Sequence, residues 1–283
     1  EVSRKKSTPQ KSIANATSRR SRHDRSPFPT PTSEESMKIA LVTGASRGLG
    51  LEWCRQLAEE DGFDKVYAGH RGEAGKALAG LAWEKKKVVP LSLDVTSAES
   101  VAALAATLET LDLLVNNAGI RPEECGPDVL LDQLDLDAMS QTLSTNVVAP
   151  TRVLQACLPA LSRVPGFTVV NVSSSLGSTA KVGDTRSIFP IIAATDLAYR
   201  CSKAALNNLT ACAALECSER FPGSVVVALE PGWVDTDMGS RNGKDSPPLT
   251  AHDSVKAQLT TVLGLTPADT GKYLSPTGDV VPW

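Results

Sequence analysis

Tyr199 and Lys203 are the residues whose types and spacing point most directly to chemistry. Because they stand four positions apart, they would share one face of a helix. A tyrosine is a poor acid–base group at its usual pKa of about 10, but a neighbouring ammonium favours the phenolate and lowers that pKa. The pair therefore predicts proton transfer where partner groups accompany it, since a lone Tyr-x-x-x-Lys on a helix is usually a surface pair.

A glycine-rich loop follows the first apolar run of the chain. Residues 38–43 are typical of a buried strand, and Gly44, Gly48 and Gly50 come directly after them. Glycines let the backbone turn sharply and approach a pyrophosphate, while the next helix offers free N–H groups and its positive dipole end. Such turns also serve tight packing, but the position at the first strand–helix junction favours phosphate binding.

Two arginines indicate which dinucleotide this loop would bind. An NAD site usually carries an acidic residue about 20 positions beyond the glycines, where it accepts from the ribose 2′-hydroxyl. Here Arg71 stands at the end of the second strand and Arg47 lies inside the loop. Guanidinium groups make charge-assisted bonds to a 2′-phosphate. Although both could be ordinary surface arginines, their joint placement predicts a preference for NADP(H) over NAD(H).

Strand and helix patterns alternate from Met37 to the end of the chain. Apolar runs at 38–43, 65–68, 88–93, 113–115, 167–172 and 224–229 predict strands, and long helical patterns cover about 134–162 and 199–218. Strands that are apolar on both faces indicate a parallel sheet covered on both sides. We therefore predict a doubly wound α/β fold, with one domain over 37–283 and its ligand at the carboxyl ends of the strands.

Charge is spread unevenly along the 283 residues. The whole chain has 29 basic and 32 acidic residues, but residues 1–36 hold eight basic and four acidic ones. The remainder is therefore acidic, with a net charge of −7, which argues against nucleic-acid binding by the folded domain. No apolar run is long enough to cross a bilayer, so we expect no membrane partner.

Residues 1–36 are rich in Ser, Arg and Pro and could bury almost no apolar surface, so we expect a disordered extension. Their composition suits an organelle transit peptide, a nucleic-acid or phospho-regulated arm, or an irrelevant extension ahead of an initiator at Met37. These alternatives give a cytoplasmic location, or a plastid or mitochondrion if the segment is a transit peptide. The six cysteines show no paired spacing and the three histidines are isolated, so we expect free, buried thiols and no metal site.

Four motifs in order resemble the short-chain dehydrogenase/reductases over essentially all of 37–283. They are the glycine loop ending at Gly50, Asn116-Asn-Ala-Gly119, the Tyr199/Lys203 pair and Pro231-Gly232. Longer stretches at 198–207, 231–239 and the ending Gly-Asp-Val-Val-Pro-Trp are similar to sniffer-type carbonyl reductases and C-factor proteins. The resemblance implies a Rossmann fold and a nicotinamide cofactor.

The resemblance also assigns roles. It implies that Tyr199 gives a proton to a carbonyl oxygen, that Lys203 binds the nicotinamide ribose, and that Ser174 holds the substrate carbonyl. It further implies that Asn146 supports a water feeding protons through Lys203; the alternative is that Asn146 merely distorts its helix. With the loop and the two arginines, the expected cofactor-binding residues are Gly44, Ser46, Arg47, Gly48, Leu49, Gly50, Arg71, Asp94, Val95, Asn117, Ala118, Gly119, Tyr199, Lys203, Pro231, Gly232, Val234 and Thr236.

The sequence departs from the family pattern at two places. Glu230 precedes Pro231, where close relatives usually carry a neutral residue or His, and 25 positions separate Ser174 from Tyr199. The extra residues, about 179–196, include an apolar run at 188–192. We interpret them as an apolar flap that selects a bulky or apolar substrate; the alternative is a neutral loop insertion.

These observations predict an NADPH-dependent oxidoreductase that reduces a small, apolar aldehyde or ketone, with Tyr199 as general acid. The alternative is a cofactor-binding, C-factor-like signalling or interaction protein with little turnover. A sugar-nucleotide epimerase or dehydratase is disfavoured because no second substrate domain fits in 283 residues. The two long helical segments could also pair two subunits in a homodimer, as in the family.

Overall fold

The strands of the protein form one parallel sheet in the computed structural model, which describes residues 37–73, 76–126, 128–182 and 196–283. Within these ranges seven strands are hydrogen-bonded in the order β3-β2-β1-β4-β5-β6-β7. Their bounds are Ile39–Thr43 (β1), Lys65–His70 (β2), Val88–Ser92 (β3), Leu113–Asn116 (β4), Thr168–Val172 (β5), Val225–Leu229 (β6) and Tyr273–Leu274 (β7). All six pairings are parallel, which confirms the predicted doubly wound α/β fold.

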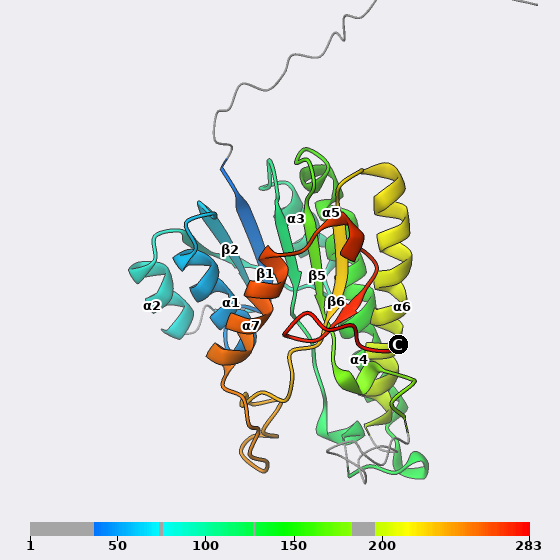
Figure 1. Cartoon of the computed structure of the whole chain (residues 1–283). Coiled ribbons are helices and arrows are strands. Elements are labelled where there is room, and N and C mark those ends of the chain that lie inside the picture. The colour runs from blue at the N-terminus through cyan, green and yellow to red at the C-terminus, as the bar shows by residue number, and fades with distance from the viewer. Residues whose placement is uncertain (1–36, 74–75, 127, 183–195) are drawn as a thin grey trace, which may run out of the picture. The chain divides into compact units, whose positions relative to one another are not determined.

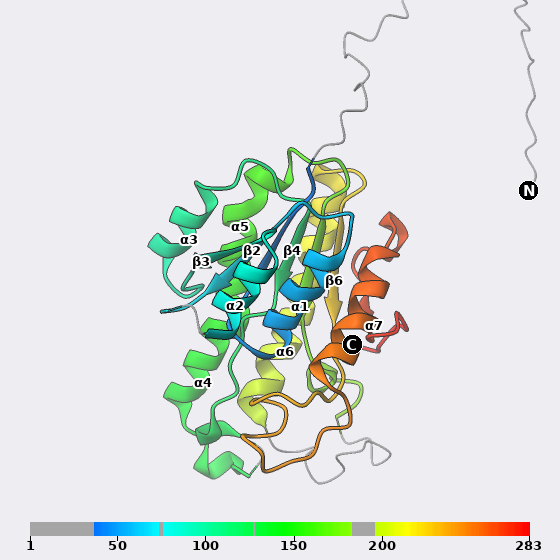
Figure 2. The same ribbon diagram turned by 90° about the vertical axis from the view of Figure 1, so that its left-hand side faces the viewer.

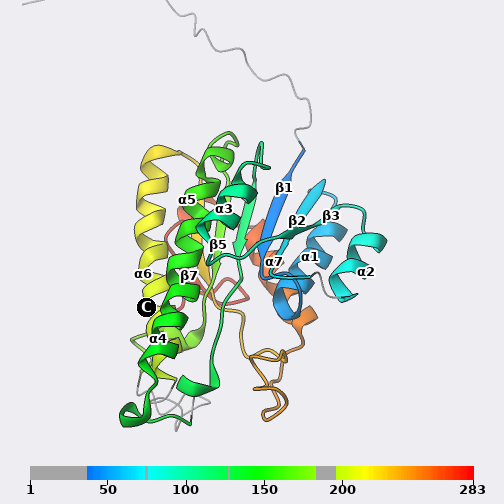
Figure 3. The ribbon, with the colours of Figure 1, turned by 180° about the vertical axis from the view of Figure 1, so that it is seen from behind.

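Helices cover both faces of the sheet (Figures 1 and 3). One face, seen from its own side in Figure 2, carries α1 (Gly48–Glu59), α2 (Lys76–Glu84) and α7 (Ala251–Leu263). The other carries α3 (Ala98–Ala105), α5 (Ala149–Leu161) and α6 (Leu197–Arg220). Each face has its own apolar core, because every residue of β1, β4 and β6 is buried and successive side chains point to opposite faces.

A π-helical turn interrupts the long helix that follows β4. Helix α4 (Leu136–Leu143) runs into a wider turn, Ser144–Val148, before α5 continues to Leu161. The helix predicted over about 134–162 is therefore confirmed, with an irregular centre. Asn146 occupies this turn and is buried. Single π turns inside helices often occur at functional sites.

Helix α6 follows Asp196, whose backbone lies in the left-handed region with φ 60°. Its amino-terminal half carries the predicted acid–base pair on a buried face, with Tyr199 at 8% and Lys203 at 4% exposure. Packing against β6 and against the turn Ser175–Gly177 after β5 brings this face to the carboxyl ends of the central strands. The helix thus positions the predicted chemistry at the expected edge of the sheet.

Residues 37–283 form one compact unit. Two expectations fall outside the described residues: the disordered extension over 1–36, and most of the predicted apolar flap, whose residues 183–195 include the 188–192 run. Within the described part of the chain, no helix combines the length and the apolar character needed to span a membrane. The six cysteines are free as expected, but Cys212 is exposed and Cys201 half-buried, so only four behave as buried apolar residues.

Candidate active site

A cavity of about 1230 Å³ opens at the carboxyl ends of the strands. Every residue predicted to bind the cofactor lines it, from Gly44 in the glycine loop to Thr236 after β6. Ser174, Tyr199 and Lys203 line the same cavity, while Asn146 lies behind the wall, next to lining residue Thr145. The structure therefore brings the predicted cofactor residues and the predicted catalytic group together in one place.

The glycine loop is shaped by close backbone approach. Gly44 and Gly48 have φ values of 68° and 54°, a region that side chains disfavour. A Cβ on Gly50 would collide with the carbonyl of Gly44 and would lie 2.5 Å from Nδ2 of Asn117. Asn117 in turn donates from Nδ2 to the carbonyl oxygens of Thr43 (2.9 Å) and Gly44 (3.3 Å). The turn after β4 thus braces the loop after β1.

Helix α1 begins at this loop without a side-chain cap. By contrast, Ser97, Asp135 and Thr250 accept backbone hydrogen bonds at the starts of α3, α4 and α7. The residue before α1 is Arg47, and its side chain makes no capping bond. The first N–H groups of α1 therefore remain available to an anion, and the helix dipole favours negative charge there.

Arg47 and Arg71, the two arginines predicted to bind a 2′-phosphate, both line the cavity, and each also interacts with a carboxylate. Arg47 donates from Nη1 to Oδ2 of Asp237 at 2.7 Å, and both side chains are largely exposed. Arg71 lies near Asp94, where its charge contributes to a lowered pKa whose larger causes are the side-chain and backbone hydrogen bonds from Thr96. Arg47 and Arg71 therefore supply positive charge to the same cavity as the predicted adenosine contacts Asp94 and Val95.

Tyr199 and Lys203 face each other across a buried corner of the cavity. Nζ of Lys203 lies 5.6 Å from the centroid of the Tyr199 ring and donates to the carbonyl oxygen of Val172 at 2.8 Å. Burial lowers the pKa of Lys203 to about 8. The ammonium is held by the end of β5 rather than by a carboxylate, and it loses its proton as the pH rises past about 8.

The net shift in the pKa of Tyr199 is upward, against the direction expected from a neighbouring Lys203 ammonium alone. Burial raises the pKa of Tyr199, because a phenolate is costly away from water. Arg121 and the nearby Ser174 hydroxyl lower the pKa, and Asp196 raises it further. The cation that lowers this pKa is thus Arg121, a residue that sequence reasoning did not single out.

Ser174 lines the cavity beside Tyr199, and its hydroxyl lowers the pKa of that tyrosine. Its Oγ also accepts from the backbone N–H of Leu176 at 3.2 Å, and its carbonyl accepts from the Tyr273 hydroxyl at 2.6 Å. The turn packs directly on α6, because a Cβ on Gly177 would lie only 2.8 Å from Cβ of Lys203. Gly177 therefore fixes how close the serine comes to the acid–base pair.

Asn146 holds the backbone that follows the Asn-Ala-Gly turn. Its Oδ1 accepts from the N–H of Ile120 at 2.8 Å, and its Nδ2 donates to the Ile120 carbonyl at 2.9 Å. Nδ2 also donates to Oγ of Ser202 at 3.0 Å, which itself donates to the Tyr199 carbonyl at 2.7 Å. The side chain thus links the cofactor wall to α6 and does more than distort its own helix.

Glu230, the departure noted in the sequence, lines the cavity at the end of β6. Burial raises the pKa of its carboxyl, against the backbone hydrogen bond from Gly232 and the charge of Lys181. Its Oε2 accepts from the Gly232 N–H at 3.0 Å. The carboxyl therefore orders the Pro231-Gly232 turn from inside the cavity.

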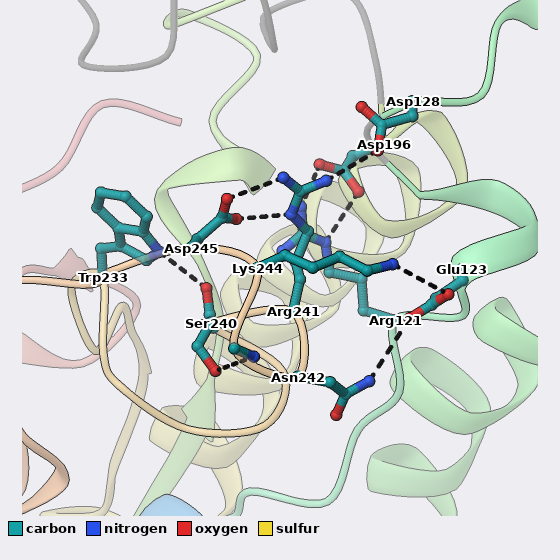
Figure 4. A network of polar contacts seen from close by, with 12 residues as sticks. Arg121, Glu123, Asp128, Asp196, Trp233, Ser240, Arg241, Asn242, Lys244 and Asp245 are labelled. Carbon is teal, nitrogen blue, oxygen red and sulfur yellow. Dashed lines mark hydrogen bonds and ion pairs between the residues drawn. The ribbon is translucent and has the colours of Figure 1, made fainter.

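A charged network closes the far wall of the cavity (Figure 4). Arg241 donates to both carboxylate oxygens of Asp245, at 2.6 and 2.8 Å, and to Asp128 at 2.9 Å. Beside it, Lys244 pairs with Glu123 at 3.4 Å. These contacts tie the loop after β6 to the loop after β4. The contacts of Arg241 with Asp128 and of Lys244 with Glu123 join residues more than 110 positions apart, so sequence reasoning missed them.

Comparisons with known proteins agree with this geometry. Residues 38–247 match the family description "short chain dehydrogenase". The C-signal protein of Myxococcus xanthus is 38% identical over 173 residues, which cover 61% of this chain and 93% of that protein. Among solved structures, an NADPH-bound carbonyl reductase from chicken fatty liver superposes with a TM-score of 0.76 at 33% identity, covering 87% of this chain and 99% of the other.

The carbonyl reductase Sniffer of D. melanogaster also superposes with a TM-score of 0.76, at 28% identity, covering 87% of this chain and all of that one. Strands β1 to β6, the glycine loop and the Tyr199/Lys203 pair all lie inside the matched region. The chain is therefore a member of the short-chain dehydrogenase/reductase family of oxidoreductases.

Proposed function

We propose that the protein reduces the carbonyl group of an aldehyde or ketone to an alcohol, with NADPH as the hydride source. The observation that carries this proposal is that Ser174, Tyr199 and Lys203 line the same cavity, with the Ser174 hydroxyl close enough to lower the pKa of Tyr199 and with Nζ of Lys203 5.6 Å from the centroid of its ring. A carbonyl oxygen placed between the two hydroxyls would accept a hydrogen bond from each.

The cavity residues fit a nicotinamide dinucleotide. The uncapped start of α1 suits a closely approaching pyrophosphate, and Gly50 lets the loop beside it pack tightly against Gly44 and Asn117. Arg47 and Arg71 support binding of a 2′-phosphate, hence NADP(H). When bound, the reduced nicotinamide supplies a hydride to the carbonyl carbon. We assign to the cofactor the lining residues predicted above.

The proton is transferred by residues of the protein. In this proposal Ser174 holds the carbonyl oxygen and Tyr199 donates its phenolic proton to it, so that the hydride and the proton together make the alcohol. Lys203, protonated below a pKa of about 8, stabilises the phenolate that remains. Hydrogen bonds among Asn146, Ser202 and Ile120 hold α6 against the cofactor wall.

The substrate side of the cavity supports a carbonyl compound with an apolar body. Its lining there combines the apolar side chains of Ile120, Leu176, Trp233 and Met238 with the charged network of the far wall. This mixture favours a small aldehyde or ketone that carries a polar group at its outer end.

Turnover of NADPH with a panel of aldehydes and ketones tests the reaction. Tyr199→Phe should lower kcat at least about a hundredfold while the protein still binds NADPH, because only the transferable proton is lost. If Tyr199→Phe oxidises NADPH as fast as the parent protein, the mechanism is wrong. If NADPH binds and no carbonyl is turned over, the reductase proposal fails as a whole.

An Arg71→Asp variant tests the cofactor assignment. A carboxylate there would repel the 2′-phosphate and accept from a 2′-hydroxyl, so the preference should move toward NADH. An unchanged ratio of kcat/KM for NADPH and NADH would remove the assignment of Arg71.

We further propose that two copies of the chain pair through α5 and α6. Val148, the residue before α5, is 49% exposed and Leu215 on α6 is 72% exposed, so apolar side chains on this surface are open to solvent. Leu215→Glu should convert a dimer to a monomer in sedimentation. A parent protein that sediments as a monomer would refute this.

A further inference from the structure

Arg121 is the one described residue that joins the cofactor wall to the start of the catalytic helix by a buried ion pair. It follows Ile120, whose N–H and carbonyl are both held by Asn146. Its Nε donates to Oδ1 of Asp196 at 2.8 Å and its Nη2 to Oδ2 at 2.5 Å. Figure 4 shows this two-point contact beside the Arg241 network. A planar fork matched to a carboxylate fixes both partners.

Asp196 is built for this contact. The residue is fully buried, and the Arg121 side chain is only 15% exposed. Asp196 precedes α6, yet its carboxylate makes no capping bond to the helix and its φ of 60° is unusual for a residue with a side chain. A position of this kind persists only where its surroundings hold it, and here the buried arginine does so.

The pair places a permanent cation against the general acid. Cζ of Arg121 lies 5.7 Å from the centroid of the Tyr199 ring, almost the same distance as Nζ of Lys203. Lys203 has a pKa of about 8 and loses its charge as the pH rises through that value. A guanidinium stays charged throughout. Arg121 therefore supplies a positive field where the lysine no longer does.

The other groups around Tyr199 make this field significant. In the described part of the chain, charged or polar groups face this corner from α6, from the segment before it and from the ends of β4 to β7. They are Lys203 and Arg200 on α6, Asp196 before it, Arg121 after β4, Ser174 after β5, Glu230 after β6 and Tyr273 in β7. Asp196 and burial oppose phenolate formation at Tyr199, so the cations must offset them.

We propose that Arg121, held by Asp196, is a positioning residue that stabilises the phenolate of Tyr199 and so sets the pH range in which the enzyme works. The inference rests on the proposed carbonyl reduction, in which Tyr199 gives up its proton. Arg121 acts through Tyr199 and does not itself donate to the substrate. Its role differs from that of Lys203, which is held by the carbonyl of Val172.

Two substitutions should shift the pKa of Tyr199 in opposite directions. Arg121→Gln removes the cation and keeps an amide that can donate to Asp196, so the alkaline limb of kcat/KM for carbonyl reduction should move up by about one pH unit. Asp196→Asn removes the anion that raises the pKa of Tyr199, so the limb should move down. A purely structural role would lower the rate at every pH and leave the limb in place.

Arg220→Gln is the matched control. Arg220 also pairs with a carboxylate, Glu216, and its Cζ lies 5.0 Å from the centroid of the Phe221 ring, but it stands in the last turn of α6. This variant should keep the parent's pH profile. The proposal is overturned if the alkaline limb of Arg121→Gln stays within about 0.3 pH unit of the parent's, whatever the rate of that variant. If Arg121→Gln does not fold, the proposal is overturned by an Asp196→Asn variant whose alkaline limb is unmoved or moves up.

A measurement without turnover separates this inference from the proposed function. The chain has three tyrosines, so the ultraviolet titration of the NADP⁺ complex, minus that of Tyr199→Phe, isolates the ionisation of Tyr199. We expect this ionisation to move up in Arg121→Gln. A shift without any carbonyl turnover would refute the reductase and leave the role of Arg121 standing; turnover without a shift would refute the role alone.

Discussion

The hydroxyl of Tyr273 donates a 2.6 Å hydrogen bond to the carbonyl oxygen of Ser174, 99 positions earlier in the chain. Tyr273 is buried in the short last strand, and its ring stacks on that of Trp283 with centroids 5.5 Å apart. Backbone and side-chain donors of residues 178–180 also bind the carbonyl of Trp283. The segment that carries the candidate catalytic serine is thus held by the end of the chain.

Tyr273→Phe should therefore weaken catalysis without abolishing NADPH binding. Losing this hydrogen bond leaves a buried carbonyl with one donor fewer, which costs about 1–2 kcal/mol of unfolding free energy. We expect kcat to fall severalfold while the KM for NADPH stays within twofold. Tyr67→Phe, on the half-buried β2, serves as the control. Equal kcat values for the two variants would contradict the proposed support of Ser174.

Gly177→Ala should abolish most activity in a folded protein. The added Cβ would lie 2.8 Å from both the carbonyl carbon and Cβ of Lys203, so the serine turn must move away from α6. A displacement of this kind costs catalysis more than stability, since reacting groups tolerate little misplacement. We expect kcat/KM to fall by about a hundredfold.

The control for this change is Gly80→Ala. Gly80 lies in α2 and a Cβ there would meet nothing within 4 Å, so alanine should be neutral or should stabilise the helix by up to about 1 kcal/mol. Thermal unfolding and steady-state rates on both variants make the comparison. A fully active Gly177→Ala protein would show that the serine turn does not depend on this close approach.

Lys203 should make stability depend on alkaline pH. Its folded pKa of about 8 lies below the usual value of about 10.4, so between these pH values the unfolded chain binds the extra proton. Stability relative to a Lys203→Met variant should therefore rise with pH across this window, by up to about 3 kcal/mol. Urea unfolding at several pH values measures it; a difference that is flat or falls would contradict the lowered pKa.

Asp237→Asn should improve the use of NADPH. The carboxylate of Asp237 holds Arg47 in an exposed ion pair, which must open or share the arginine when a 2′-phosphate binds. Exposed pairs contribute about 0.2–1 kcal/mol, so kcat/KM for NADPH should rise by up to about fivefold, and that for NADH should not. Asp235→Asn removes a nearby exposed charge as the control. Equal gains with both cofactors would indicate another cause.

The sequence alone predicts the elements whose signals are local. The apolar runs of β1 to β6, the glycine loop and the Tyr199/Lys203 face each follow from spacing within a few residues. It does not predict β7, because two residues carry no period, and the strand exists only because it pairs with β6. Helix α7 has a readable pattern in Val255, Leu259 and Val262, which could have been found.

The candidate site was predictable in its members and less so in its electrostatics. Tyr199 was expected to depend on Lys203 because they share a helix face. Arg121 lies 75 positions from Asp196, and only the docking of α6 against the turn after β4 brings its charge to the phenol. The available signal is a basic residue two positions after Gly119 of the Asn-Ala-Gly turn, but single charges in loops usually face water.

The π turn at Ser144–Val148 adds a constraint on how this site can change in evolution. An α-helix advances by about 100° per residue, so losing one residue here would restore a regular helix and swing α4 by that angle relative to α5. Asn146 would leave Ile120, and the buried Thr142 would turn toward another neighbour. Substitutions in these helices can therefore accumulate one at a time, whereas a change in length within the turn would dismantle the site in a single step.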